Sequence, residues 1–138
     1  MTVAPASGGR KALATGAVSA AFAVALGAFA AHGLEGSLEA QDLEVFETGV
    51  RYHFFHALGG VAAGFALERR EGPSRALGLS AALFLAGTVL FSGSLYVLAV
   101  TGARWLGAVT PLGGVAFIAG WIALAIGALR RESGPSPR

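Results

Sequence analysis

The chain has 138 residues, of which 54% are apolar and only 13% are charged, about half the charged share of a typical soluble domain. It contains no cysteine, which excludes a disulfide framework, a thiolate metal site and a cysteine nucleophile. Its basic residues are scattered at the ends of apolar stretches and form no stripe, so we predict no nucleic-acid partner.

Four long apolar stretches fill most of the chain, roughly residues 12–31, 50–67, 77–100 and 112–129. A helix rises about 1.5 Å per residue and the hydrocarbon core of a bilayer is about 30 Å thick, so about 20 apolar residues span it. We therefore predict an all-α protein that forms a four-helix transmembrane bundle. Its predicted partner is the lipid bilayer in which the bundle is embedded. The predicted helices are residues 12–31, 41–67, 76–101 and 111–130, all within one domain over residues 12–130.

The two ends of the chain are predicted to lie outside this domain. Residues 1–11 are expected to form a disordered N-terminal tail, and residues 131–138 a C-terminal tail. The first apolar stretch is about 20 residues long, whereas the apolar region of a signal peptide has about 7–15. We therefore expect a retained membrane helix and not a cleaved leader.

The basic residues predict the orientation in the membrane. Arg51 and Arg104 lie on one side of the predicted bundle. The opposite side, which holds both ends of the chain and the loop between the second and third helices, carries Arg10, Lys11, Arg69, Arg70, Arg75, Arg130, Arg131 and Arg138. Because lysine and arginine resist translocation, the richer side is the cytoplasmic one. We predict a multi-pass protein with both termini in the cytoplasm.

The second helix is predicted to carry an amphipathic extension at its outer end. Leu43 and Phe46 recur at helical spacing, and Glu47 and Arg51 lie four residues apart in the order that favours an ion pair. The strictly apolar part, residues 54–67, is too short to span a bilayer alone. The helix must therefore include the preceding turn, with the Arg51 side chain extending toward water.

Two rows of small residues predict close contact between helices. Ala23, Gly27 and Ala31 recur every four residues in the first helix, and Gly60 and Gly64 make a GxxxG pair in the second. Small residues let neighbouring backbones approach closely in lipid.

Chemically informative polar residues gather toward the outer ends of the helices. His53 and His56 share a helix face, and His32 ends the preceding helix at about the same predicted depth. The candidate binding cluster consists of His32, Glu47, Arg51, Tyr52, His53, His56, Ser92, Ser94, Tyr96 and Thr110.

Three hypotheses account for this cluster. It can anchor helix ends, with a buried Glu47–Arg51 pair tying down the first loop. It can be a ligand site, with two imidazoles for a haem iron, three for Zn²⁺, or a polar end that seats a quinone or lipid headgroup. A transport path is disfavoured, because the deep halves of the four stretches lack charged residues. His-x-x-His alone is a weak motif, so we assign no metal, cofactor or catalytic residue.

Four ordered blocks carry a resemblance to a known family. They read GAFAAHGL at 27–34, VFETGVRYHFFHAL at 45–58, FSGSLY at 91–96 and GAVTPLGG at 107–114, with Gly120-Trp121 further on. They resemble the small membrane proteins catalogued as domain of unknown function 423, which include the eukaryotic transmembrane protein 256. The resemblance covers roughly residues 10–130 and implies a four-helix protein of the bacterial inner membrane, with no assigned activity. In the family pattern a glutamine is common at the position of His53, which implies His32 and His56 as the pair to test for a ligand.

Two functions follow from these observations. The first is a structural or accessory membrane component without catalysis, which packs through its small-residue faces with itself, as a homo-oligomer, or with a larger membrane complex. The alternative is a small binding protein for haem, quinone or lipid at the histidine cluster.

Overall fold

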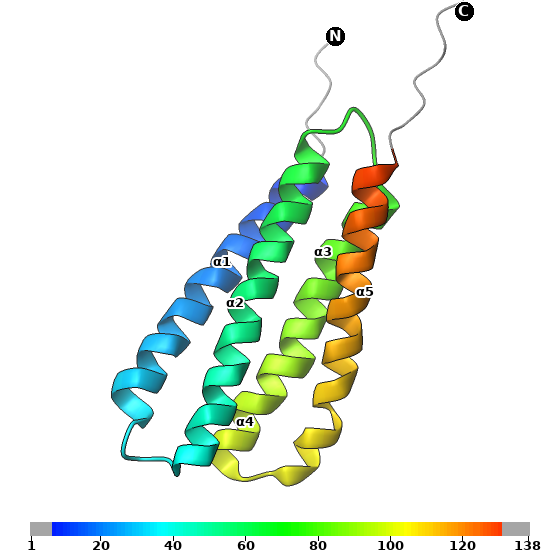
Figure 1. Cartoon of the computed structure of the whole chain (residues 1–138). Helices are drawn as coiled ribbons and strands as arrows, with labels where there is room; N and C mark the ends of the chain where they lie inside the picture. Colours follow the sequence, from blue (N-terminus) through cyan, green and yellow to red (C-terminus); the bar gives the residue numbers. More distant parts are fainter. Residues whose placement is uncertain (1–6, 131–138) are drawn as a thin grey trace, which may run out of the picture.

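The computed structural model describes residues 7–130, and within them every regular element is helical (Figure 1). In chain order the elements are α1 (Ser7–Phe29), η1 (Ala30–Leu34), α2 (Ala40–Glu68), α3 (Arg75–Gly87), η2 (Thr88–Ser92), α4 (Gly93–Thr101), η3 (Arg104–Ala108) and α5 (Thr110–Leu129). Two of the short elements, η1 and η2, are π-helical turns, and η3 is a 3₁₀ helix. Since η2 joins α3 to α4 without a break, the third predicted helix is one long helix with a π turn inside it.

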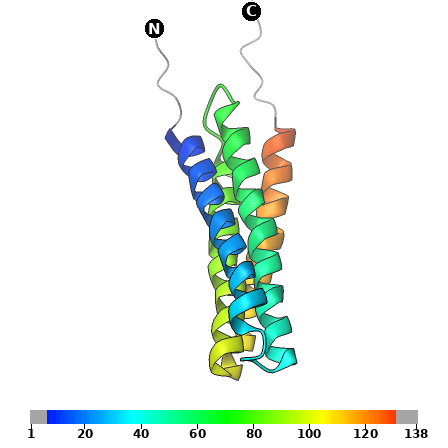
Figure 2. The same cartoon turned by 90° about the vertical axis from the view of Figure 1, so that its left-hand side faces the viewer.

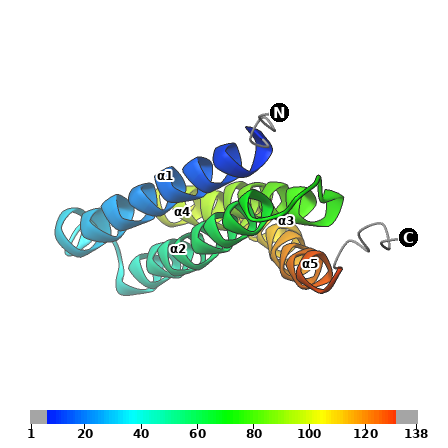
Figure 3. The ribbon, with the colours of Figure 1, turned by 90° about the horizontal axis from the view of Figure 1, so that it is seen from above.

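The long helices run up and down in one bundle (Figure 1). The first helix packs along α2, and α5 packs along α3, while α2 contacts all the other long helices (Figure 2). Seen from above, α1 and α5 lie on opposite sides, with the other helices between them (Figure 3). The first residue of α1, Ser7, and the last residue of α5, Leu129, lie at the same end of the bundle as the loop between α2 and α3.

Three segments of the described chain are long and apolar enough to cross a membrane, namely Gly8–Leu34, Arg75–Thr101 and Arg104–Leu129. The remaining helix, α2, has 29 residues and is therefore long enough, at about 43 Å. Its polar residues, among them Arg51 and two histidines, make it less apolar than the other three. The predicted amphipathic character of its first turns is present, because Phe46 is buried while Glu47 and Arg51 are exposed.

The prediction for the N-terminal tail was wrong in part. Residues 7–11, expected to be disordered, form the first turns of α1. Gly9 is buried there against Glu68, the last residue of α2, so packing at the end of α2 holds these turns. The remainder of the N-terminal tail, and the C-terminal tail of residues 131–138, lie outside the described residues.

Small residues do bring α1 and α2 together, but along a different row from the predicted one. The buried positions of α1 and of the π turn that continues it recur every seven residues, at Gly9, Gly16, Ala23 and Ala30, whereas Ala31 is exposed. Helices that cross at a shallow angle keep the same face in contact over a seven-residue period, which explains the difference.

The predicted GxxxG contact is confirmed. A methyl group built on Gly64 would overlap the backbone nitrogen of Leu13, and one built on Gly16 would lie 2.6 Å from the backbone nitrogen of Val61. These are the positions at which the two backbones approach most closely in this helix pair.

Candidate functional site

Three of the ten predicted site residues lie exposed near the end of the bundle where α2 begins. His32 is exposed in the π turn η1, and Glu47 and Arg51 are exposed on the first turns of α2. The predicted buried ion pair is wrong, because neither side chain is buried and no ion pair joins them within residues 7–130. Water and lipid headgroups can solvate both charges there, so nothing drives them together.

A chain of hydrogen bonds crosses the interior of the bundle and joins three helices. The Ser19 hydroxyl of α1 lies 3.0 Å from His53 Nε2, and His53 Nδ1 lies 3.0 Å from the Tyr96 hydroxyl of α4. His53 is buried. Ser92, which lies one turn before Tyr96, is fully buried, and its side chain lies beside that of Tyr96. The Ser92 hydroxyl does not complete a hydrogen bond of good geometry with a described residue. Both ring nitrogens of His53 are thus committed to hydroxyl groups.

This polar chain lies deeper than predicted. His53 follows the start of α2 at Ala40 by 13 residues, or about 20 Å, and precedes its end at Glu68 by 15 residues, or about 22 Å. It therefore sits near the middle of the helix and not at its outer end. The reason is that the first turns of α2 are occupied by the amphipathic extension, whose Phe46 packs in a cluster with Leu34 of η1.

His56 belongs to a separate aromatic cluster. Its ring stacks on Phe117 of α5 with 3.4 Å between ring centres, and Phe84 and Trp121 lie within about 6 Å. Its Nδ1–H donates to the backbone carbonyl of Tyr52 at 2.6 Å, which fixes the tautomer. Tyr52 itself stacks beside His56, so two predicted site residues share this cluster.

The last two predicted residues tie α4 to α5. The Ser94 and Thr110 hydroxyl oxygens lie 2.8 Å apart, and each hydroxyl also lies within hydrogen-bond distance of a carbonyl of the preceding turn, that of Phe91 and that of Leu106. This pair holds two helices together, and its hydroxyl groups are engaged with the protein itself.

The histidines do not form the three-imidazole Zn²⁺ site that was one of the alternatives. Within the described residues no group of three or more histidine, cysteine or acidic side chains is placed to hold a metal ion. His32 is exposed next to the beginning of α2, whereas His56 lies 16 residues, or about 24 Å, along that helix. The two imidazoles suggested as a haem pair therefore lie at different depths and do not face one iron.

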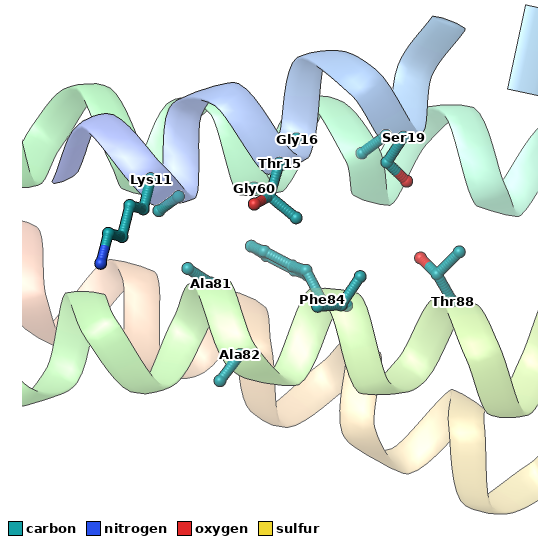
Figure 4. Close-up of a pocket in the computed structure, with 12 residues that line it drawn as sticks. Lys11, Thr15, Gly16, Ser19, Gly60, Ala81, Ala82, Phe84 and Thr88 are labelled. Atoms are coloured by element: carbon teal, nitrogen blue, oxygen red, sulfur yellow. The ribbon is translucent and has the colours of Figure 1, made fainter. Parts of the chain in front are cut away.

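A crevice between α1, α2 and α3 adjoins the polar chain (Figure 4). Its volume is about 170 Å³, and small apolar residues such as Ala57, Gly60 and Ala81 form much of its wall. The few contacts between α1 and α3 leave it open along one side. Lys11 lies at the end of the crevice nearest the described termini, where α1 begins.

Thr15, Ser19 and Thr88 bring hydroxyl groups to this crevice, and those of Ser19 and Thr88 lie at the end away from Lys11 (Figure 4). Ser19 reaches it from α1, and Thr88 reaches it from the opposite wall, at the beginning of the π turn η2 (Figure 4). Thr88 is only 8% exposed, and its hydroxyl forms no hydrogen bond within the described part of the chain. The site predicted from the sequence contains neither Ser19 nor Thr88, although hydroxyl groups in apolar membrane helices can bond across to other helices.

Comparison with known proteins places this site in a family context. The chain matches the family described as Protein of unknown function (DUF423) over residues 26–114. It is 50% identical over 115 residues to the UPF0382 membrane protein YwdK of Bacillus subtilis, which covers 83% of this chain and 93% of that protein. It is 43% identical over 114 residues to the UPF0382 inner membrane protein YgdD of Escherichia coli, covering 83% and 86%.

This chain belongs to the DUF423 family. A further relative, a UPF0382 membrane protein of Haemophilus influenzae, is 44% identical over 117 residues, or 85% of this chain and 92% of that protein. The names of these relatives describe membrane proteins and indicate no catalytic activity. No solved structure matches the chain. The resemblance noted in the sequence is thereby confirmed, and the protein is a membrane protein of an uncharacterised family.

The segment matched by the family contains some of the site residues but not all of them. Within the DUF423 segment lie His53, Thr88, Ser92 and Tyr96, which are the contributions of α2, η2 and α4. Ser19 precedes the matched segment, on the part of α1 that forms one wall of the crevice.

Proposed function

We propose that this protein is a non-catalytic membrane protein that binds one small amphiphilic molecule in the crevice between α1 and α3. The observation that carries the proposal is the Thr88 hydroxyl, which opens on the crevice from a residue only 8% exposed and forms no hydrogen bond with a described residue. In hydrocarbon an unpaired hydroxyl group is unfavourable by a few kcal/mol, because no water is present to bond it. A bound molecule with a polar head would supply the missing partner, and its apolar part would extend through the open side into the lipid.

The small residues of α1 pack against α2 of the same chain, which supports a binding role over a purely structural one. The small-residue stripe of α1, which includes Gly16 and Ala23, packs against α2 of the same chain. It is therefore unavailable to a second copy or to a larger complex, the partners expected from the sequence. Association with either one stays a prediction and would use the outer apolar faces, where Val18, Phe22 and Val24 are exposed.

We propose further that α2 is a fourth membrane span, so that both termini lie in the cytoplasm. In support, the described ends of the chain share one end of the bundle with the charged loop that follows α2. That end carries most of the basic residues, including Arg69, Arg70 and Arg75. The relative in Escherichia coli is named an inner membrane protein, and we propose the same location here.

Native mass spectrometry of the protein released from mild detergent tests the binding proposal. Ala81 lines the crevice, and Ala81→Phe fills it with a ring. Ala86 lies exposed on the same helix outside the crevice, so Ala86→Phe is the matched control. We expect the wild type and Ala86→Phe to retain a bound non-protein molecule that Ala81→Phe lacks. Equal occupancy in all three proteins, with equal helicity by circular dichroism, would contradict the proposal.

A further inference from the structure

The crevice between α1 and α3 has a polar stripe on its α1 wall. Lys11, Thr15 and Ser19 follow one another at four-residue spacing, so they share one face of the helix, and all three line the crevice (Figure 4). The stripe covers eight residues, or about 12 Å, from the beginning of α1 toward the middle of the bundle. A polar group that enters beside Lys11 therefore meets a hydroxyl at the next turn of the helix and another at the turn after it.

The deep end of the crevice lies far from both ends of the membrane-spanning segment. Thr88, on the wall opposite Ser19, follows the beginning of α3 at Arg75 by 13 residues and precedes the end of α4 at Thr101 by 13 residues, or about 20 Å each way. Of the described residues that line the crevice, Lys11 is the one that carries a charge, and it lies at the other end. A charged head group beside Thr88 would be buried at mid-depth without a counter-ion, which is strongly unfavourable. The group bound there is therefore uncharged.

Ser19 and Thr88 both keep hydrogen-bonding capacity at this deep end. If His53 Nε2 is protonated, it donates to the Ser19 oxygen and the Ser19 O–H is left to donate; in the other tautomer Ser19 donates to Nε2 and its oxygen is left to accept. The Thr88 hydroxyl, which forms no hydrogen bond with a described residue, can do either. A hydroxyl group between the two walls both donates and accepts, so it completes the network in either tautomer of His53. A carbonyl group accepts only and suits one tautomer.

The volume of the crevice limits what accompanies that hydroxyl group. A cavity of about 150 Å³ lined by apolar side chains accommodates benzene, a molecule of about six carbon-sized units. The crevice, at about 170 Å³, therefore encloses a hydroxyl group and about six carbons of one hydrocarbon chain. Small residues such as Gly16, Gly60 and Ala81 line it, and its open side lets the rest of the chain continue into the lipid.

We propose that the bound amphiphile is an uncharged lipid alcohol with a single hydrocarbon chain, whose hydroxyl group lies between Ser19 and Thr88. This inference rests on the amphiphile-binding function proposed above and names the class of its ligand. The Thr15 hydroxyl, which is exposed one turn before Ser19, offers a partner to the head group on its way from the mouth to the deep end. A chain without a polar head would leave the Thr88 hydroxyl unpaired, which is why the alcohol is preferred.

Probes that share one hydrocarbon chain test the head group. Oleyl alcohol carries a hydroxyl, methyl oleate carries a carbonyl that accepts but does not donate, and oleyl sulfate carries a permanent negative charge. Each probe is added at increasing mole fraction to the protein in dodecylmaltoside micelles, and native mass spectrometry measures the occupied fraction. We expect oleyl alcohol to bind about tenfold more tightly than methyl oleate, the effect of one hydrogen bond, and oleyl sulfate to bind more weakly than either. An ester or a sulfate that binds as tightly as the alcohol would overturn the assignment.

Variants of the hydroxyl groups locate the head group within the crevice. Thr88→Val keeps the side-chain shape and removes the hydroxyl, so we expect about tenfold weaker binding of oleyl alcohol, whereas Thr88→Ser retains the affinity. Thr15→Val removes the exposed hydroxyl of the same crevice and is the matched control, with no measurable loss expected. Unchanged affinity in Thr88→Val would show that the head group does not lie at the deep end, and the proposal would be wrong.

The Ala81→Phe and Ala86→Phe proteins distinguish failure of the lipid alcohol from failure of the crevice as a binding site. We expect oleyl alcohol binding to be abolished in Ala81→Phe and retained in Ala86→Phe, because Ala81 alone of the two lines the crevice. If Ala81→Phe loses the molecule retained on purification but binds oleyl alcohol as the wild type does, the crevice holds an amphiphile of another class. If Ala81→Phe changes neither, both proposals fall.

Discussion

The close contact between α1 and α2 predicts opposite outcomes for two glycines of one helix. Replacing either Gly60 or Gly64 by alanine brings the same gain in helix propensity, up to about 1 kcal/mol. The new methyl group on Gly60 would lie 3.6 Å from the Gly16 Cα, an ordinary contact. The methyl group on Gly64 would overlap backbone atoms of Leu13, which cannot move aside without shifting α1. Overpacking of this kind costs about 1–3 kcal/mol.

Since the propensity gain cancels between the two variants, their difference isolates the backbone contact. We expect the Gly64→Ala protein to be about 1–3 kcal/mol less stable than Gly60→Ala. Equilibrium unfolding in dodecylmaltoside micelles with increasing dodecyl sulfate, followed by circular dichroism, measures both free energies of unfolding. A Gly64→Ala protein as stable as Gly60→Ala would show that α1 does not approach α2 this closely, and the packing described for this pair would be wrong.

The other predictions concern the polar residues and the topology. His53→Leu should lower the free energy of unfolding by about 0.6–1.7 kcal/mol, the range for hydrogen bonds between membrane helices, and His53→Gln by less; equal losses would contradict the bonded chain. Arg70→Ala should speed hydrogen exchange in the last turn of α5, because the Arg70 guanidinium donates to two carbonyls there; unchanged exchange would rule out this cap. Glu47→Gln should change the free energy of unfolding by less than about 0.5 kcal/mol in the same assay, since the side chain is exposed. A larger loss would indicate that Glu47 and Arg51 do form an ion pair. The chain has no cysteine, so Ser37→Cys and Glu71→Cys can be labelled one at a time with a membrane-impermeant maleimide; labelling from opposite sides is expected if α2 spans the membrane, and labelling from one side would refute it.

The helices were predictable from the sequence because apolar length is set by the bilayer and not by tertiary contacts. The predicted ranges 76–101 and 111–130 agree with the observed helices within one residue at each end. The start of α1 was not predictable in this way, since it depends on the contact between Gly9 and Glu68. The seven-residue row on α1 likewise depends on the angle at which α2 crosses it. The sequence offered a four-residue row that was equally regular.

The residue types of the candidate site were predictable, but their grouping was not. Hydroxyl, imidazole and phenol groups in apolar helices stand out by composition, and this identified His53, Ser92 and Tyr96. Their neighbours on other helices are fixed only by how the helices rotate about their own axes. Ser19 lies on α1 and was overlooked because one serine in an alanine-rich helix has no distinguishing spacing. The crevice has no sequence signal at all, since it arises where α1 and α3 diverge.

The central position of α2 explains both its low apolar content and the place of the crevice. A polar side chain at mid-depth is tolerated only if it faces protein partners, and α2 is the helix that contacts all the others. His53 can therefore bond to α1 on one side and to α4 on the other, while His56 faces the rings of α5. The Ser19–His53 bond helps hold α1 to α2 near the level of Thr88, where α1 and α3 remain apart. The Ser19–His53 bond thus stabilises the α1 wall of the crevice. It also orients the Ser19 hydroxyl, which a molecule bound near Thr88 would contact.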